Sequence, residues 1–105
     1  MVSDSTLKSI TQRLVEHFHP ERIILFGSQA RGTADEHSDV DILVVCPISG
    51  SRRAMMVAMD RAMRGLNIAR DIMVLSPKEF DVNRFIPGTV ARGASQQGRM
   101  LYEKT

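Results

Sequence analysis

The chain has 105 residues, with 43% hydrophobic and 25% charged side chains and a formal net charge of +2, which predicts one soluble globular domain over residues 1–105. No apolar run approaches the ~20 residues of a membrane-spanning helix, and the weak, scattered positive charge makes no strong case for direct nucleic-acid binding. The single cysteine, Cys46, excludes an internal disulfide and, with no visible secretory signal, predicts a cytoplasmic protein.

The first half of the chain alternates between helical and strand-like patterns. Apolar side chains recur at helical spacing between Leu7 and Phe18, which predicts a helix, and Pro20 follows its end. β-branched and aromatic residues then mark two strands, and the second is apolar enough to predict burial on both faces. The expected elements are, in order, strand 22–26, short helix 28–31, polar loop 33–37 and strand 40–46.

The second half continues this alternation. A methionine-rich apolar stripe predicts a core-facing helix over residues 52–66, with Gly65 at its C-terminal end. Four further elements are expected: strand 71–75, a short helix opened by Ser76-Pro77, a helix within residues 85–97, and strand 98–103. This order predicts an α/β (α+β) fold with a small mixed β-sheet flanked by helices.

Two aspartates open the central strand. Asp39 and Asp41 are two residues apart, so alternation along a strand places both on one face, with Cα atoms ~7 Å apart. Carboxylates this close repel each other unless a cation lies between them, and Mg²⁺ prefers carboxylate oxygens together with substrate phosphates. A strand cap at Asp39 and a solvent-facing Asp41 are the alternative, but a central strand disfavours aspartate that has no function. We therefore predict a metal site.

A glycine-serine turn precedes these aspartates by one strand. The missing Cβ of Gly27 lets the backbone approach a phosphate closely, and a helix that begins at Ser28 directs its amide toward an anion. An ordinary strand-to-helix turn is the alternative. Arg31 either binds a phosphate or pairs with Asp35 or Glu36, and the sequence leaves both possibilities open.

A third carboxylate opens the next strand. Asp71 stands where an adjacent strand can deliver it to the same metal site, and there it would accept the proton of an attacking hydroxyl. Pairing with Arg70 or capping of the strand end is the alternative.

These residues resemble the signature of a known family. The chain reads Gly27-Ser28-x-Ala30-Arg31-Gly32, then a five-residue gap, then Ser38-Asp39-x-Asp41. This pattern closely resembles that of the DNA polymerase β-like nucleotidyltransferases, and most of all their minimal nucleotidyltransferase (MNT) branch. The resemblance implies a polymerase β palm-like fold.

The resemblance also implies an activity and roles for individual residues. It implies transfer of a nucleoside monophosphate from ATP to an acceptor hydroxyl, with two Mg²⁺ ions as cofactors. By family analogy Asp39 and Asp41 bind both ions, and Asp71 completes the site as the base. The implied nucleotide-binding residues are Gly27, Ser28 and Ser38, and we add Arg31 as a further candidate.

The short chain and the resemblance together suggest the acceptor. MNT proteins include the antitoxins of HEPN–MNT toxin–antitoxin pairs, in which the nucleotidyltransferase adenylylates a tyrosine on a helical ribonuclease toxin. The chain ends soon after Asp71, so we expect a partner protein to present the acceptor. Two alternatives stay open: transfer to a small molecule with a helical partner completing the site, and neutralisation of a toxin by binding alone. Homo- or hetero-oligomers are compatible with each.

Overall fold

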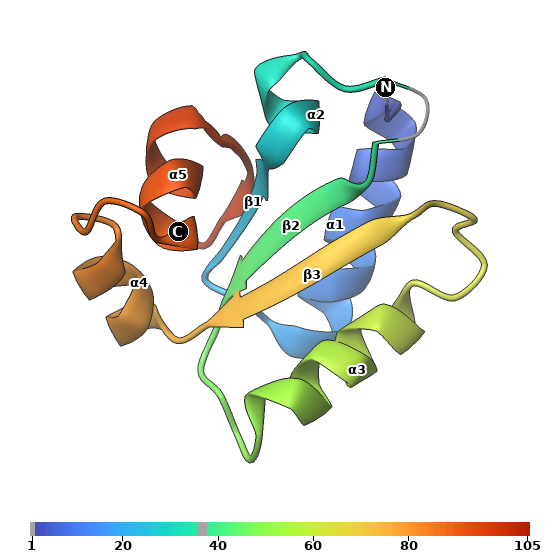
Figure 1. Cartoon of the computed structure of the whole chain (residues 1–105). Coiled ribbons are helices and arrows are strands. Elements are labelled where there is room, and N and C mark those ends of the chain that lie inside the picture. The colour runs from blue at the N-terminus through green and yellow to red at the C-terminus, as the bar shows by residue number, and fades with distance from the viewer. Residues whose placement is uncertain (1, 36–37) are drawn as a thin grey trace.

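The structure is a computed structural model that describes residues 2–35 and 38–105. Its helices and strands follow the predicted order (Figure 1). They are α1 (Asp4–Phe18), β1 (Arg22–Phe26), α2 (Gly27–Arg31), β2 (Val40–Val45), α3 (Arg52–Ala62), β3 (Arg70–Leu75), α4 (Pro77–Asn83), α5 (Val90–Gln97) and β4 (Arg99–Glu103). Glu36 and His37, which belong to the predicted polar loop, lie outside the described residues.

The four strands form one mixed sheet in the order β3-β2-β1-β4. The β2 and β3 strands pair in parallel, whereas β1 pairs antiparallel with both β2 and β4. This order leaves β2 in the interior and β3 at an edge. The predicted small mixed sheet is confirmed.

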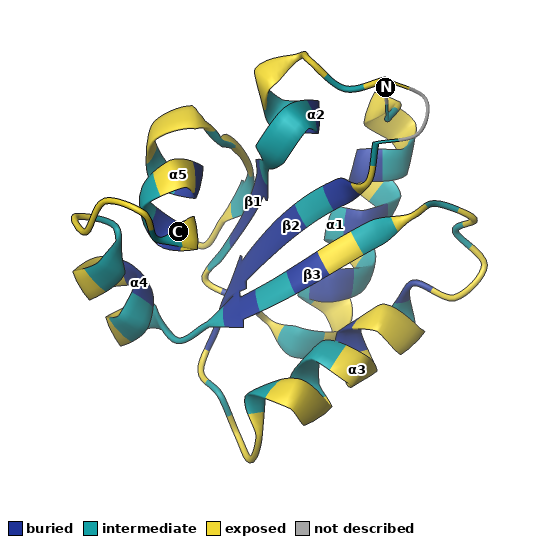
Figure 2. Ribbon diagram, in the orientation of Figure 1, coloured by how far each residue is buried: buried dark blue, intermediate teal, exposed yellow. Residues whose placement is uncertain are grey.

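Helices cover both faces of the sheet (Figures 1 and 2). Side chains of α1 and α3, such as Ile10 and Met59, pack with Ile42 in one cluster of buried residues. Phe80 of α4 and the alanines of α5 pack with Leu43 on the other face. Because β2 contributes to both clusters, the prediction that this strand is buried on both faces is confirmed.

Two predicted helices are shorter than the sequence pattern indicated. The helix predicted over 52–66 ends at Ala62 with Met63 as its C-cap, so the prediction that Gly65 ends it is wrong. Met63 and Leu66 still reach the core, but they do so from the following turns, and the apolar spacing therefore continues past the helix. The helix expected within 85–97 begins at Val90, because residues 85–89 form turns that end on an N-cap at Thr89.

Gly98 allows α5 and β1 to approach closely. A Cβ at this position would clash with the carbonyl oxygen of Ala94 and would lie 2.7 Å from Cγ2 of Ile24. We predict that Gly98→Ala lowers the free energy of unfolding by about 1–3 kcal/mol, because the backbone atoms that the new methyl group would meet cannot move away without strain. Gly93→Ala on the same helix is the control. A Cβ at Gly93 meets no atom of residues 2–35 or 38–105 within 4 Å, so this variant should stabilise the protein by about 0.5–1 kcal/mol. Urea denaturation of both variants checks this, and equal effects would contradict it.

An ion pair joins the start of α3 to the start of α4. The Arg52 guanidinium donates to both carboxylate oxygens of Glu79, at 3.0 and 2.7 Å, and to the carbonyl oxygen of Val74 at 2.8 Å. Glu79 also completes a capping box with Ser76, whose backbone N–H donates to it at 2.9 Å. The hydrogen bond from Arg52, with that from Ser76, lowers the pKa of Glu79 to about 2.

The Arg52–Glu79 ion pair makes the stability of the protein depend on pH in the acid range. A carboxyl whose pKa falls on folding stabilises the protein above its ordinary pKa of 4.5 and loses that contribution as the pH falls toward about 2. Because both side chains are partly exposed, we expect Glu79→Gln to lower the unfolding free energy at neutral pH by only about 0.5–1.5 kcal/mol. The difference from wild type should shrink through that acid range in chemical denaturation. Glu21→Gln, at an exposed carboxylate, serves as the control, and a difference that grows on acidification would refute the assignment.

Candidate functional site

The sheet brings the predicted carboxylates together. In the parallel pairing of β2 and β3, Asp41 is the direct register partner of Asp71. Neighbouring strands are ~4.8 Å apart, so side chains of register partners that share a face lie next to each other. Asp39 lies two residues before Asp41 along the chain and is exposed, whereas Val40 between them is fully buried. This alternation places Asp39 with Asp41 on the face opposite the buried Val40.

The electrostatics of Asp41 reflect this crowding. Partial burial raises the pKa of the Asp41 carboxyl above its ordinary value, and the negative charges of Asp71 and Asp39 raise it further. The positive charge of Arg31 acts in the opposite direction. Partial burial and two neighbouring carboxylates therefore disfavour the ionised form of Asp41, which is the situation that a bound cation relieves.

Gly27 lies against the Asp41 carboxylate. Its φ of +72° is in the left-handed region, and a Cβ added to it would overlap Oδ2 of Asp41 and lie 3.2 Å from Cγ. The contact follows from the pairing of β1 with β2, in which Phe26, the residue before Gly27, is the register partner of Asp41. Gly27 thus makes room for the carboxylate, a role that the sequence did not predict and that is separate from the predicted approach to phosphate.

Gln29 fixes the backbone around the site and was missed by the sequence analysis. This side chain is only 6% exposed. Its amide nitrogen donates to the carbonyl oxygen of Ser38 at 3.2 Å, and its Oε1 accepts from the backbone N–H of Val2 at 3.0 Å. Gln29 therefore ties α2 to the residue before Asp39. A glutamine in a short polar segment gives no local signal of such burial.

The remaining predicted nucleotide-binding residues lie around the same end of β2. The Ser38 hydroxyl donates to the Asp35 carboxylate at 3.2 Å and accepts from the Asp35 backbone N–H at 3.1 Å, so it orders the loop before Asp39. Ser28 lies in the first turn of α2, and Arg31 is its last residue, followed by a C-cap at Gly32. Binding of phosphate by Ser28, Arg31 and Ser38 stays a prediction.

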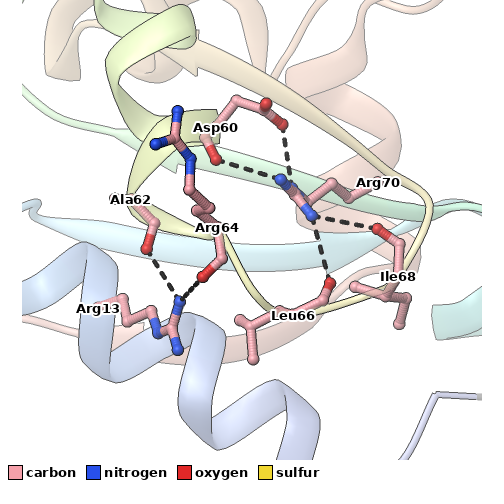
Figure 3. A network of polar contacts seen from close by, with 7 residues as sticks. All are labelled: Arg13, Asp60, Ala62, Arg64, Leu66, Ile68 and Arg70. Carbon is pink, nitrogen blue, oxygen red and sulfur yellow. Dashed lines mark hydrogen bonds and ion pairs between the residues drawn. The ribbon is translucent and has the colours of Figure 1, made fainter.

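Arg70 holds the segment that leads into Asp71 (Figure 3). Its guanidinium pairs with the Asp60 carboxylate at 3.0 Å and donates to the carbonyl oxygens of Leu66 and Ile68. The alternative in which Asp71 pairs with Arg70 is therefore wrong, because Asp60 takes that place. Nearby, Arg13 of α1 donates to two carbonyl oxygens at the end of α3, and the two arginines together fix the α3–β3 connection.

The donor set suits a divalent cation bound together with a phosphate. Asp39, Asp41 and Asp71 offer the hard carboxylate oxygens that Mg²⁺ prefers. Within the described residues, however, no three His, Cys, Asp or Glu side chains are arranged closely enough to hold an ion by themselves. Mg²⁺ commonly takes only one or two carboxylates and completes its shell with substrate phosphate and water. We therefore keep the metal site as a prediction that requires the nucleotide.

Comparison with known proteins identifies the family. The model of the nucleotidyltransferase domain family matches residues 6–97, which include all the predicted site residues. The chain belongs to this family. The resemblance drawn from the Gly-Ser and Asp-x-Asp motifs is thereby confirmed.

Known proteins resemble the chain in part of its sequence or in its fold. Over 31 residues, it is 64% identical to the "Putative protein adenylyltransferase" of Methanocaldococcus jannaschii, a match that covers 30% of this chain and only 21% of that protein. A crystal structure of a toxin–antitoxin with AMP-PNP superposes with a TM-score of 0.70 at 21% identity, covering 94% of this chain and 74% of the other. The complex of tri-AMPylated Shewanella oneidensis HEPN toxin with MNT antitoxin gives a TM-score of 0.64 at 19% identity, covering 95% and 71%. The chain therefore shares its fold with these two solved structures.

No helix in residues 2–35 or 38–105 is long and apolar enough to cross a membrane.

Proposed function

We propose that this nucleotidyltransferase domain transfers AMP from ATP to a hydroxyl group of a partner protein. The observation that carries the proposal is the register of β2 and β3, which sets Asp71 directly beside Asp41, while Gly27 at the start of α2 leaves space for the Asp41 carboxylate. Carboxylates from neighbouring strands beside a glycine turn are the parts that a metal-dependent transfer of a nucleotidyl group requires.

Each residue has a defined role in the proposed reaction. Asp39, Asp41 and Asp71 would hold Mg²⁺, which would neutralise phosphate charge and make the α-phosphorus more electrophilic. Gly27 and Ser28 would contact the ATP phosphates through their backbone amides. Asp71 would take the proton of the acceptor hydroxyl. The hydroxyl oxygen then forms a bond to the α-phosphorus, and the bond to pyrophosphate breaks with its electron pair leaving on pyrophosphate.

We further propose that the acceptor is a tyrosine on a HEPN-type toxin and that the domain acts as its antitoxin. Support comes from the fold shared with the MNT antitoxin of a tri-AMPylated HEPN toxin and from the adenylyltransferase name of the partial relative. The surface also favours a protein partner. Four large apolar side chains of α4, of the start of α5 and of the segment between them are at least 37% exposed: Val82, Phe85, Ile86 and Val90.

The proposal is tested by measuring the mass of the partner protein after the reaction. The chain is mixed with ATP, Mg²⁺ and the product of the adjacent gene, and the partner is analysed by intact mass spectrometry. We expect a gain of one or more AMP units that disappears in the Asp39→Ala/Asp41→Ala variant. Neutralisation that survives this double substitution without any gain in mass would instead identify a non-catalytic antitoxin. Transfer of AMP only to a small molecule would refute the protein acceptor.

A further inference from the structure

Three arginines around α3 have no internal partner. Arg53, Arg61 and Arg64 are exposed, and within the described residues no hydrogen bond or ion pair engages their guanidinium groups. Arg13 and Arg70 differ from these three because their guanidinium groups form hydrogen bonds within the α3–β3 connection. In Figure 3 the Arg64 guanidinium carries no dashed line. Unpaired guanidinium groups that gather on one surface are available to bind an anionic partner.

These arginines border a groove between α3 and the edge strand β3. Arg53 and Arg61 are eight residues apart on one face of α3, with the 45%-exposed Val57 between them. Together with Asp71 and Ile72 of β3 they line a groove with a volume of about 540 Å³. Because β3 is an edge strand, the groove lies open beside it. The Asp71 side chain alternates with that of Ile72, which packs on the α3 side, so the Asp71 carboxylate lies across the β3 edge from the groove.

The topology assigns this groove to the acceptor and not to the nucleotide. Gly27 reaches Asp41 from the β1 side of β2, whereas Asp71 reaches it from the β3 side. A nucleotide whose phosphates lie at Gly27 therefore leaves the Asp71 side free for the attacking hydroxyl. A segment that lies in the groove and continues over the β3 edge would bring a hydroxyl to Asp71, the carboxylate that is proposed to take its proton.

The charges of the groove determine the kind of acceptor segment that fits. Asp60 also lines it, but its carboxylate is already paired with Arg70. This leaves Arg53 and Arg61, with Arg64 nearby, as the charges free to attract a ligand. We propose that the groove receives an acidic segment of the partner protein, with glutamate or aspartate side chains flanking the acceptor hydroxyl. This inference rests on the proposed function, since it assumes a protein acceptor.

A peptide is a better fit than a single-stranded RNA. The lining includes the apolar side chains of Met56, Val57 and Ile72, which suit aliphatic contacts along a peptide. None of the described lining residues is aromatic, whereas binding of single strands relies on aromatic rings on which the bases stack.

The test uses a fluorescent peptide with a central tyrosine flanked by glutamates, and a matched peptide flanked by lysines. We expect wild-type protein to bind the acidic peptide at least about tenfold more tightly than the basic one, with an affinity that falls as salt is added. Arg53→Glu/Arg61→Glu should weaken binding of the acidic peptide by at least about tenfold. Lys8→Glu/Lys104→Glu, which changes the net charge equally but lies away from the groove, should leave it unchanged. These results would support the inference.

Three outcomes would overturn it: equal binding of the two peptides, equal loss in both double variants, or stronger arginine-dependent binding of a single-stranded oligouridine than of the acidic peptide. The thermal shift caused by ATP with Mg²⁺ keeps this failure separate from failure of the proposed function. If ATP and Mg²⁺ stabilise the wild type and both variants while the peptides show no preference, the acidic acceptor is wrong and the nucleotide site stands. If ATP and Mg²⁺ do not stabilise the wild type, the proposed function itself fails, and the inference fails with it.

Discussion

Replacing Asp41 by asparagine is expected to reduce AMP transfer by at least about 10³-fold, the scale of effect seen when a group that stabilises transition-state charge is removed. Asp41 is the central carboxylate of the site, since Asp71 is its register partner and Gly27 lies against its side chain. An asparagine keeps the size of the side chain but loses the negative charge that a metal–nucleotide complex needs. The rate is measured as AMP incorporated into the partner, and retention of more than about a tenth of wild-type activity would contradict the assigned role.

The same substitution is expected to raise stability in the absence of metal. Like charges on directly opposed residues of neighbouring strands destabilise a sheet, and relief of one such pair is worth about 0.2–1 kcal/mol. Urea denaturation at neutral pH with a chelator should therefore show Asp41→Asn to be more stable than wild type. Asp81→Asn, at an exposed position in α4, is the control and should have little effect. A loss of stability in Asp41→Asn would mean that Asp41 has a structural role.

The pH dependence of this gain has a definite sign. Folding raises the pKa of Asp41, so the folded state binds a proton there more readily than the unfolded state does. The destabilisation is therefore fully present above the raised pKa and disappears as the pH falls below the ordinary value of 3.8. The advantage of Asp41→Asn should shrink on acidification, which is measured by repeating the denaturation at decreasing pH.

Gly27→Ala is expected to reduce both stability and transfer. Its positive φ is unfavourable for alanine, and the new methyl group must displace the Asp41 carboxylate that it would overlap. We expect a loss of about 1–3 kcal/mol in unfolding free energy from the strained backbone and the clash. Misplacement of a reacting group by ~1 Å costs about 10²-fold in rate, so transfer should fall by at least that factor.

Gly32→Ala is the matched control for this prediction. Gly32 has a similar φ of +75°, but a Cβ there meets no atom of the described residues within 4 Å. Gly32→Ala should therefore lower the unfolding free energy by about 1–2 kcal/mol through backbone strain, and it should keep most of its transfer activity. Melting curves and transfer rates for both variants separate the two effects. An equal loss of transfer in both would show that backbone strain alone, and not displacement of Asp41, explains the result.

Local sequence patterns were sufficient to predict the order of the elements. Apolar periodicity and the positions of prolines and glycines identified each helix and strand, because these signals report which side chains a local segment can bury. They overestimated α3, since the core contacts of Leu66 follow the helical period although the residue lies in a turn. The apolar spacing predicts which side chains are buried, but it does not predict whether their backbone is helical.

The contacts that assemble the candidate site were less predictable. The Asp-x-Asp spacing placed Asp39 and Asp41 on a strand, but the meeting of Asp41 with Asp71 depends on the parallel register of β2 and β3. The space that Gly27 leaves for Asp41 likewise depends on strand pairing. Gln29 bonds to Ser38 and Val2 across the fold. Such long-range contacts leave no periodic trace in the sequence. The position of Asp71 at the start of a strand suggested that it joins the site, whereas its register and the contacts of Gly27 and Gln29 come from the structure.

The position of the label in ATP provides the most direct test of the central claim. Wild-type protein and its partner are incubated with Mg²⁺ and ATP labelled either at the α-phosphorus or at the γ-phosphorus. We predict that the partner takes up the α-label and not the γ-label and that γ-labelled ATP releases labelled pyrophosphate. With Asp41→Asn we expect no uptake of the α-label and no release of labelled pyrophosphate. Uptake of the γ-label, or α-label uptake that Asp41→Asn leaves intact, would contradict nucleotidyl transfer at this site.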